Sequence, residues 1–524
     1  MLFINKIKNR LSINKLTKLE QLTLKKLVLL VGKFKEYDEQ KGIILIECLL
    51  RTPKNNIEKF LITKTILENE SLEAVSLVKH SYLKSNKAYH IFRQLGVKRF
   101  YSIESAFLNL FILVRSFIKS CAFFISTKDG SDIVNYKIND ILIGDLLYDS
   151  IIRENDKVFT VGNLKPFRDF TLVFKMFIYF FYYNSLTDRL NIKYYITSHK
   201  TYLQYGILCK LVKSKGGVVI LKDVNLLKIY DKDPIEAHIM APDYHLVKSN
   251  LNNVEFRNSA EKYIIDRFNA NAENMDIDVI SAFKNKNNYS KEDLLRVFEL
   301  NSDSKFVFVM PHAFSDSPHV GTGMLFNDYF EWLVETLKAI SKNDNYHIFI
   351  KPHPTSYCWG ETGVVEELVK TMCLDKVHIV PNDLNTNCIP KIADVVVTCQ
   401  GTIALECACF GTPSIVAGHG YFHGYNLSNY FNTKDEYLEF LSTFDEIKVL
   451  DDRCKMLAKV ILYTEVNARV YSSSVPLEDI LPVDDYYQEE INLWKKINEL
   501  LGSYNYASDP LLNKISNYLI EKKV

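Results

Sequence analysis

The feature that most constrains this chain is a pair of short apolar runs that each end abruptly in polar, loop-forming residues. Residues 345–354 read NYHIFIKPHP, and residues 393–418 read ADVVVTCQGTIALECACFGTPSIVAG. The first run stops at KPHP, and the second stops at QGT, where a helix is predicted to begin. In an open α/β sheet, ligands bind beyond the carboxyl ends of parallel strands. The pattern therefore predicts one ligand crevice lined by two strand ends about 50 residues apart, a separation that a βαβ unit allows.

Apolar runs alternate with helical stretches along the chain and predict two α/β halves with parallel sheets. In the first half we expect strands at residues 42–46, 158–161, 194–197 and 218–221. In the second half we expect them at 306–310, 346–350, 377–380, 394–399 and 414–417, with an amphipathic helix at 326–340. The polar residues 285–305 are predicted to include a linker. We therefore expect one Rossmann-like domain at 1–295, a second at 303–470, and a helical tail at 471–524 that packs back on the domains.

Composition excludes several classes of protein. A net charge of +1 gives no strong field that would attract a nucleic acid. The ten cysteines form no C-x-x-C pair and no disulfide framework, which is typical of reduced thiols in a cytosolic protein. The charged start of the chain lacks the pattern of a secretory signal. We therefore expect a cytoplasmic protein without bound metal.

The sequence of one segment is compatible with contact with a membrane and also with burial in the core. Residues 107–126 read FLNLFILVRSFIKSCAFFIS, an apolar stretch that Arg115 and Lys119 interrupt, so it is too broken to be a spanning helix. These two cations are four residues apart and share a helical face. The segment is either an amphipathic core helix or a helix that lies on a membrane surface. Residues 173–183, VFKMFIYFFYY, pose the same choice, and there a buried helix is predicted.

The two strand ends carry groups that suit a phosphate on a nucleotide. Pro352 and Pro354 stiffen the turn around His353 and would hold its imidazole in place. Gly401 permits close approach of the backbone, and Thr402 can cap a helix whose N-terminal N–H groups face an anion. Glu406, one turn into that helix, could take both hydroxyls of a ribose, or could simply stabilise the helix dipole.

The motifs of the two strand ends, taken together, resemble those of a known group of enzymes. KPHP, a strand and then QGT-x-x-x-E-x-x-x-x-G-x-P resemble the donor half of GT-B glycosyltransferases of bacterial surface polysaccharides, the capsule and lipopolysaccharide Kdo transferases above all. The resemblance implies two Rossmann-like domains facing a cleft, and a donor activated by CMP. It also implies a nucleotide-sugar site made of Lys351, His353, Pro354, Gln400, Gly401, Thr402 and Glu406.

The catalytic acid is expected from the first half, facing the donor across the cleft. Related enzymes carry an acidic pair followed by glycine after a strand, and here Asp223 fits the second acid of that pattern, although Lys222 replaces the first. The chemistry needs a carboxylate that either deprotonates the acceptor or attacks the anomeric carbon. The other candidate acids are Asp145 and Asp316. Further candidates for the cleft are His199, Asp149 and His312.

The predicted function is therefore metal-independent transfer of a sugar, Kdo or a similar acid sugar, from a CMP-activated donor. The expected partners are this nucleotide sugar, a glycan or lipid-linked glycan acceptor, and the cytoplasmic face of the inner membrane; no further cofactor is expected. Three alternatives stay open. They are a glycerophosphotransferase acting on CDP-glycerol, a UDP-sugar 2-epimerase, and a non-catalytic partner in capsule export.

Overall fold

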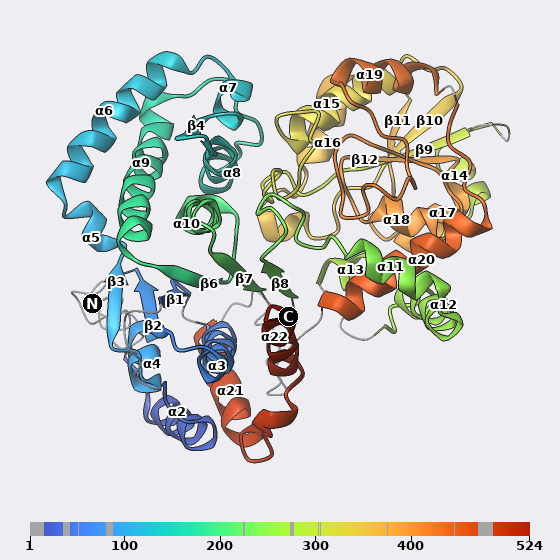
Figure 1. Cartoon of the computed structure of the whole chain (residues 1–524). Helices are drawn as coiled ribbons and strands as arrows, with labels where there is room; N and C mark the ends of the chain where they lie inside the picture. Colours follow the sequence, from blue (N-terminus) through green and yellow to red (C-terminus); the bar gives the residue numbers. More distant parts are fainter. Residues whose placement is uncertain are drawn as a thin grey trace, which may run out of the picture.

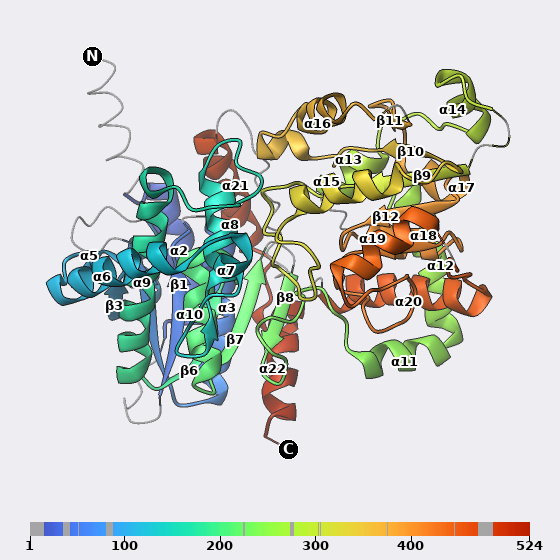
Figure 2. The same cartoon turned by 90° about the horizontal axis from the view of Figure 1, so that it is seen from above.

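The chain folds into two α/β halves that lie side by side (Figure 1). The computed structural model describes residues 15–34, 42–50, 52–79, 87–223, 226–272, 277–301, 303, 305–374, 376–444, 446–469 and 486–523. Each half is built on one mostly parallel sheet with helices on both faces, as Figure 2 shows from above. The predicted fold class, α/β with two Rossmann-like halves, is confirmed.

The first half holds a six-stranded sheet with the order β3-β2-β1-β6-β7-β8. Its strands are β1 (Ile43–Cys48), β2 (Glu73–Val78), β3 (Arg99–Ser102), β6 (Ile192–Thr197), β7 (Val218–Asp223) and β8 (Leu226–Tyr230). Neighbouring strands run parallel except β7 and β8, which pair as antiparallel strands. Every residue of β1 is buried, because helices cover both faces of a parallel sheet. A two-stranded ribbon, β4 (Lys137–Ile138) with β5 (Ile141–Leu142), lies apart from it.

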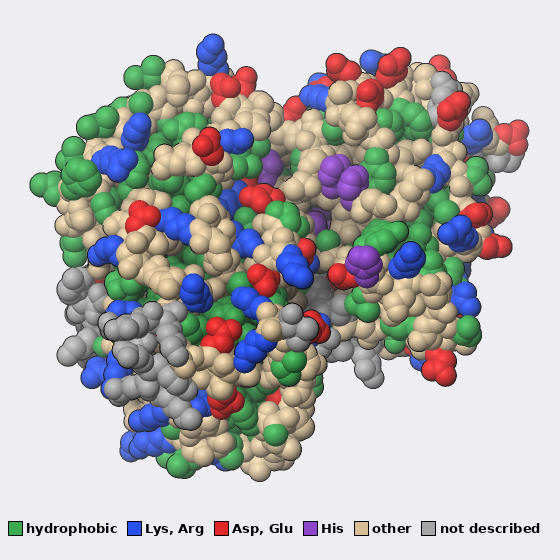
Figure 3. Space-filling model, in the orientation of Figure 1, with side chains coloured by type: hydrophobic (Ala, Val, Ile, Leu, Met, Phe, Trp, Pro, Cys, Tyr) green, Lys and Arg blue, Asp and Glu red, His purple; other side chains and the backbone are tan. Residues whose placement is uncertain are grey.

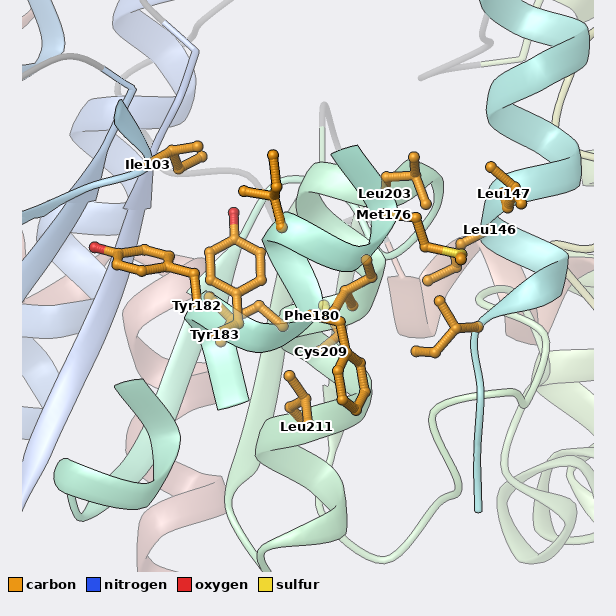
Figure 4. Packing of buried hydrophobic residues seen from close by; sticks show 14 of the residues in the cluster. Ile103, Leu146, Leu147, Met176, Phe180, Tyr182, Tyr183, Leu203, Cys209 and Leu211 are labelled. Carbon is orange, nitrogen blue, oxygen red and sulfur yellow. The ribbon is translucent and has the colours of Figure 1, made fainter. Parts of the chain in front are cut away.

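Nine helices of the described residues accompany this sheet. They are α2 (Lys18–Val31), α3 (Pro53–Asn69), α4 (Lys87–Leu95), α5 (Glu104–Phe107), α6 (Leu110–Ser126), α7 (Gly130–Val134), α8 (Gly144–Glu154), α9 (Pro166–Arg189) and α10 (Tyr202–Ser214). Figure 4 shows how side chains of α8, α9 and α10 meet in one apolar core, among them Leu147, Phe180 and Leu211. Residues 173–183 lie in α9 and are mostly buried, as predicted.

The second half holds a five-stranded, wholly parallel sheet with the order β11-β10-β9-β12-β13. Its strands are β9 (Lys305–Met310), β10 (Tyr346–Ile350), β11 (Val377–Ile379), β12 (Val395–Thr398) and β13 (Ser414–Val416). The helices around it are α15 (Tyr329–Ile340), α16 (Val364–Met372), α17 (Ile389–Ile392), α18 (Ile403–Ala408), α19 (Lys434–Thr443) and α20 (Asp452–Arg469). All five strands coincide with runs predicted from the sequence.

The connection between the halves differs from the predicted boundary at residue 295. Helices α11 (Tyr244–Asn252), α12 (Val254–Phe268) and α13 (Ile277–Phe283) precede that boundary, yet their apolar side chains share a core with α18 and α20 of the second half. Only α14 (Lys291–Val297) lies in the polar stretch taken for a linker. The reason is burial: Ala260 and Ile264 cover the apolar face of α20, which composition alone does not reveal.

The end of the chain returns to the first half. Helix α21 (Tyr486–Leu500) packs on α2, and α22 (Pro510–Glu521) packs on α3. Trp494 and Ile515 are buried there in the same core as β1. Residues 471–485 of the predicted tail lie outside the described residues.

One predicted strand is wrong. Residues 158–161 form a loop instead, and the ring of Phe159 packs against Phe314 and Phe330 of the second half. The N–H of Val161 donates to the hydroxyl oxygen of Tyr148 at 3.0 Å, so its hydrogen bond goes to a side chain rather than to a neighbouring strand. The apolar run is explained by contact between the halves, which has the same sequence signature as burial in a sheet.

Candidate functional site

Three adjacent strands of the second sheet end at one place. β9 lies between β10 and β12, so Pro311-His312, Lys351–Pro354 and Gln400–Thr402 follow neighbouring strands at the same edge. They line a cavity of about 380 Å³ that we call the strand-end cleft. Residues of α12 and α13 and the segment 238–240 form its opposite wall. Every residue predicted for the nucleotide-sugar site lines this cleft, and so do His312 and Asp316.

The turn after β10 fixes one nitrogen of the His353 ring. The hydroxyl of Thr355 donates to Asp278 Oδ1 at 2.5 Å, and therefore accepts from His353 Nδ1, which lies 3.1 Å away. This chain of hydrogen bonds holds the ring through Nδ1 and orients it at the wall of the cleft. An imidazole held in this way can meet a ligand through Nε2, which donates a hydrogen only when the ring is protonated.

Lys351 is buried in the wall of the cleft. Its ammonium donates to the carbonyl oxygen of Leu384 at 2.9 Å, and only 5% of the residue is exposed. Burial, together with the nearby Lys286, lowers the pKa of Lys351 to about 8. Lys351 thus ties the end of β10 to the loop after β11, and it lines the cleft together with His353.

The turn after β12 brings backbone close to the cleft. A Cβ at Gly401 would lie 2.8 Å from Thr398 Oγ1, so only glycine fits without a shift. The amide group of Gln400 points into the protein and donates to Pro318 O at 3.0 Å and to Tyr329 Oη at 2.6 Å. Helix α18 has only six residues, so it has no long dipole, and the N–H groups of its first turn could meet an anion only through direct hydrogen bonds.

Glu406 has a partner that the sequence did not suggest. Nε and Nη2 of Arg267, on α12, both donate to Glu406 Oε1, at 2.9 and 2.6 Å. Both residues are more than nine-tenths buried, and the Glu406 carboxylate raises the pKa of Arg267 against the effect of burial. Because both bonds end on Oε1, the second oxygen of Glu406 can accept from the hydroxyls of a ribose. Arg267 lies on an amphipathic helix far away in sequence, and no motif marks it.

His312 supplies a neutral ring. It stacks on Tyr329 with ring centroids 4.2 Å apart, and its Nε2 accepts from the N–H of Gln400 at 3.2 Å. Burial, followed by the nearby His353 and His238, lowers the pKa of His312 to about 3. His312 therefore positions the turn after β12 and carries no charge at neutral pH.

Asp316 is the one predicted catalytic acid in the strand-end cleft. Its side chain is exposed to the open space of the cleft, while protein crowds it on its other sides. Burial and then the carboxylates of Asp278, Asp149 and Glu361 raise the pKa of Asp316 to about 7, although Arg153 opposes the shift. A carboxyl group with this pKa is half ionised near neutral pH, as a general base should be.

The backbone beside Asp316 is unusual. Ser317 has φ of 42°, and Tyr202, which faces it from the first half, has φ of 59°. The hydroxyls of Ser317 and Tyr202 share a hydrogen bond, so two residues with a left-handed backbone conformation meet across the boundary between the halves. Such conformations are costly for residues other than glycine and gather at functional sites.

A second cavity, of about 370 Å³, lies between the halves, and we call it the interdomain cleft. Asp145 and Asp149 of α8 line it, together with Lys200 and Lys210 from the first half and residues 319–327 of the second. Asp145 pairs with Lys210 at 2.5 Å. Asp149 Oδ1 lies 2.6 Å from Nδ1 of His319, and this carboxylate raises the pKa of His319.

His319 was not predicted, and no motif identifies it. Its Nε2 is buried without a hydrogen-bond partner. The segment around it, residues 316–321, lines both cavities, so the two clefts share a wall. Asp149 and Asp316 thus lie on the two sides of one short segment.

The predicted catalytic residue Asp223 lines neither cleft. It lies at the end of β7, 3.7 Å from His199 Nδ1, and about a third of each side chain is exposed. Lys222, beside it, points into the first half and pairs with Glu58 at 2.9 Å, with both side chains fully buried. The structure therefore brings Asp223 and His199 together, but not with His353 and Thr402.

Two features are absent from the described residues. No group of three or more His, Cys, Asp or Glu side chains among them is arranged to hold a metal ion. No helix among them is long and apolar enough to cross a membrane. All ten cysteines are free thiols; six of them are buried, whereas Cys358 and Cys373 are exposed.

Comparison with known proteins agrees with one part of the resemblance drawn from the sequence, the link to bacterial capsule polysaccharide. Residues 218–462 match the family of capsule polysaccharide biosynthesis proteins. This range contains every residue of the predicted nucleotide-sugar site, and Asp316 and Asp223 as well. No curated protein sequence matches the chain.

Solved structures give only distant likenesses. KpsC of Thermosulfurimonas dismutans, a beta Kdo 2,4 transferase, aligns at 11% identity over 52% of this chain and 79% of its own, with a TM-score of 0.33. The UDP-GlcNAc 2-epimerase of Neisseria meningitidis aligns at 9% identity over 81% and 99%, with a TM-score of 0.21. HepE of Anabaena, in complex with UDP-glucose, aligns at 8% over 88% and 100%, with a TM-score of 0.24.

Proposed function

We propose that this protein is a glycosyltransferase that transfers a sugar from a nucleotide donor to a growing capsule polysaccharide. The observation that carries the proposal is the strand-end cleft, where His353, the Gly401 turn and Glu406 converge inside the region that matches the capsule family. Cation, backbone donors and carboxylate are the groups that a phosphate and a ribose need. The proposed donor is CMP-activated Kdo or a similar acid sugar.

In the proposed site, different protein groups bind the phosphate and the ribose of the donor. His353 and the N–H groups at the start of α18 hold the phosphate, and the second oxygen of Glu406 holds the ribose. The sugar then lies toward Asp316, at the wall shared with the interdomain cleft. We place the acceptor in the interdomain cleft, because charged side chains such as Asp149 and Lys200 line it, and because it lies between the halves and adjoins Asp316.

Asp316 is the proposed catalytic residue in place of Asp223. As a base it takes the proton of the acceptor hydroxyl while that oxygen bonds to the anomeric carbon, and CMP leaves with the electron pair of the broken bond. As a nucleophile it bonds to the anomeric carbon while CMP leaves with the electron pair of the broken bond. The acceptor oxygen then displaces the carboxylate of Asp316, and the proton of the acceptor passes to that carboxylate or to water. Mass spectrometry of enzyme mixed with donor alone separates the two, because only the second route leaves a sugar adduct on the peptide that carries Asp316.

The charge of the phosphate is proposed to be met by protein groups without a metal ion. His353 and the turn after β12 supply donors directed at the phosphate. Transfer should therefore persist after dialysis against EDTA. Loss of transfer that Mg²⁺ restores would contradict this part of the proposal.

The test of the function is a screen of thermal stability with CMP, CDP, UDP and GDP, followed by assay of the matching donor. Stabilisation by CMP and release of CMP from CMP-Kdo support the proposal. Stabilisation by UDP and turnover of a UDP-sugar without acceptor would instead indicate an epimerase, and CDP with CDP-glycerol would indicate a glycerophosphotransferase. A protein that binds none of them would be an assembly partner.

A further inference from the structure

Helix α6 exposes an apolar face that no described part of the chain covers. Six of its large apolar side chains are exposed by half or more, namely Leu110 (73%), Phe111 (74%), Val114 (51%), Phe117 (53%), Ile118 (61%) and Ile125 (85%). The side of α6 that faces the protein instead buries Ile112, Ser116, Ser120 and Phe123. The usual pattern of a surface helix, apolar inside and polar outside, is thus partly reversed.

The packing of α6 explains how this orientation is held. α6 lies along α9, and rings of the two helices touch, as in Phe117 with Phe170 and Phe123 with Phe177. The small side chains Ser116 and Ser120 let the two helices approach, and the hydroxyl of Ser120 donates to the carbonyl oxygen of Ser116. The aromatic contacts fix which face of α6 points outward, so its packing on α9 determines that the apolar face is exposed.

The exposed face has the charge of a surface that binds anions. Arg115 and Lys119 are exposed at one side of these apolar side chains, and α6 contains no acidic residue. The guanidinium of Arg115 lies 4.1 Å from the centre of the Phe181 ring. In Figure 3 the apolar side chains protrude at the edge where Figure 1 places α6, with cationic side chains between them. A soluble monomer rarely exposes a continuous apolar patch of this kind.

We propose that this face of α6 docks the protein onto the surface of an anionic lipid bilayer. The 17 residues of α6 extend for about 25 Å, enough to lie in the interface but not to span it with two charges in the middle. Apolar side chains would enter the boundary between headgroups and acyl chains, while Arg115 and Lys119 meet lipid phosphates. A second copy of the chain would not explain the cations, because α6 offers them no acidic partner.

Docking through α6 would also orient the site. α6 leads directly into α7, and Ser131, Val134 and Asn135 of α7 and its end line the interdomain cleft. The cleft in which we place the acceptor therefore opens next to the docked helix. This step rests on the proposed function, and it identifies the acceptor as one held at a membrane by a lipid.

The experiment is flotation of the full chain with vesicles of equal parts phosphatidylglycerol and phosphatidylethanolamine, compared with vesicles of phosphatidylcholine. The wild-type protein should float with the anionic vesicles at low salt and be released as salt rises. The triple variant Phe111→Ser, Val114→Ser, Ile118→Ser should reduce the bound fraction about tenfold or more. Lys119→Glu should abolish the preference for anionic lipid.

A matched control replaces three exposed apolar residues of the second half. Val254, Ile265 and Val449 are 58%, 61% and 89% exposed, and their triple change to Ser should leave flotation unchanged. Circular dichroism and calorimetry with CMP on every variant separate this inference from the proposed function, since neither the fold nor nucleotide binding involves the face. Flotation of the α6 variant at the wild-type level overturns the inference, as does failure of the wild-type protein to float. A wild-type dimer that the α6 variant dissociates would assign the face to a second copy instead.

Discussion

His353 is the residue on which the nucleotide site depends most. Its ring is oriented by Thr355 and Asp278, so replacing it removes a positioned donor without disturbing the strand. We predict that His353→Ala weakens CMP binding by about 1.5–3 kcal/mol, the value of a hydrogen bond to a charged group. Calorimetry measures it. His347→Ala, at the start of the same strand and outside the cleft, is the control, and equal affinity in both variants would remove His353 from the site.

Asp316 sets the expected pH dependence. A base acts only when ionised, so the rate of transfer should rise with pH through about 7, the raised pKa of Asp316. Asp316→Asn should lower the rate about 10²- to 10⁴-fold and remove this limb of the profile, while CMP still binds. Asp344→Asn, an exposed carboxylate paired with Lys376 on the outer loop, should change neither. If Asp316→Asn stays active, Asp149 and then Asp223 are the next residues to replace.

At the scale of elements, one ion pair joins α12 to α18. Arg267 and Glu406 are both buried, so removing one leaves the other charge without its partner. We predict that Glu406→Ala lowers the free energy of unfolding by about 3–5 kcal/mol, in addition to its effect on the nucleotide. The double variant Arg267→Met, Glu406→Leu should cost much less. Urea denaturation measures both, and equal losses in the single and double variants would argue against a coupled pair.

At the scale of the whole molecule, α8 fastens the halves together. The hydroxyl of Tyr148 donates to Asp328 Oδ2 at 2.5 Å, and Asp328 also caps α15 by accepting from the N–H of Glu331. Tyr148→Phe should lower stability by about 1–3 kcal/mol, because it leaves a buried carboxylate and the N–H of Val161 without this partner. Thermal unfolding tests it. Tyr425→Phe, in the second half and away from α8, is the comparison. An equal loss of stability in both variants would show that the contact of Tyr148 stabilises the protein no more than the hydroxyl of another tyrosine does.

Much of the second half could be predicted from the sequence because its signals are local. An apolar run followed by Pro352 and Pro354 must be a strand that ends in a stiff turn, and Gly401 must allow a close approach. The runs at 346–350 and 394–399 were strands, and their ends met at one cleft because parallel strands align their carboxyl ends. Strands β2, β3 and β8 of the first half were not among the runs predicted from the sequence.

Tertiary structure decided what local patterns cannot encode. The apolar residues of α6 are compatible with burial and with exposure, and only packing against α9 chose the face. Asp223 and Asp316 are equal in sequence as acids after strands, and the path of the chain put only Asp316 in the cleft with His353. Arg267 and His319 meet Glu406 and Asp149 over separations of 139 and 170 residues. Such pairs arise from burial, where an unpaired charge is costly, and so the folded core, not the neighbouring sequence, selects them.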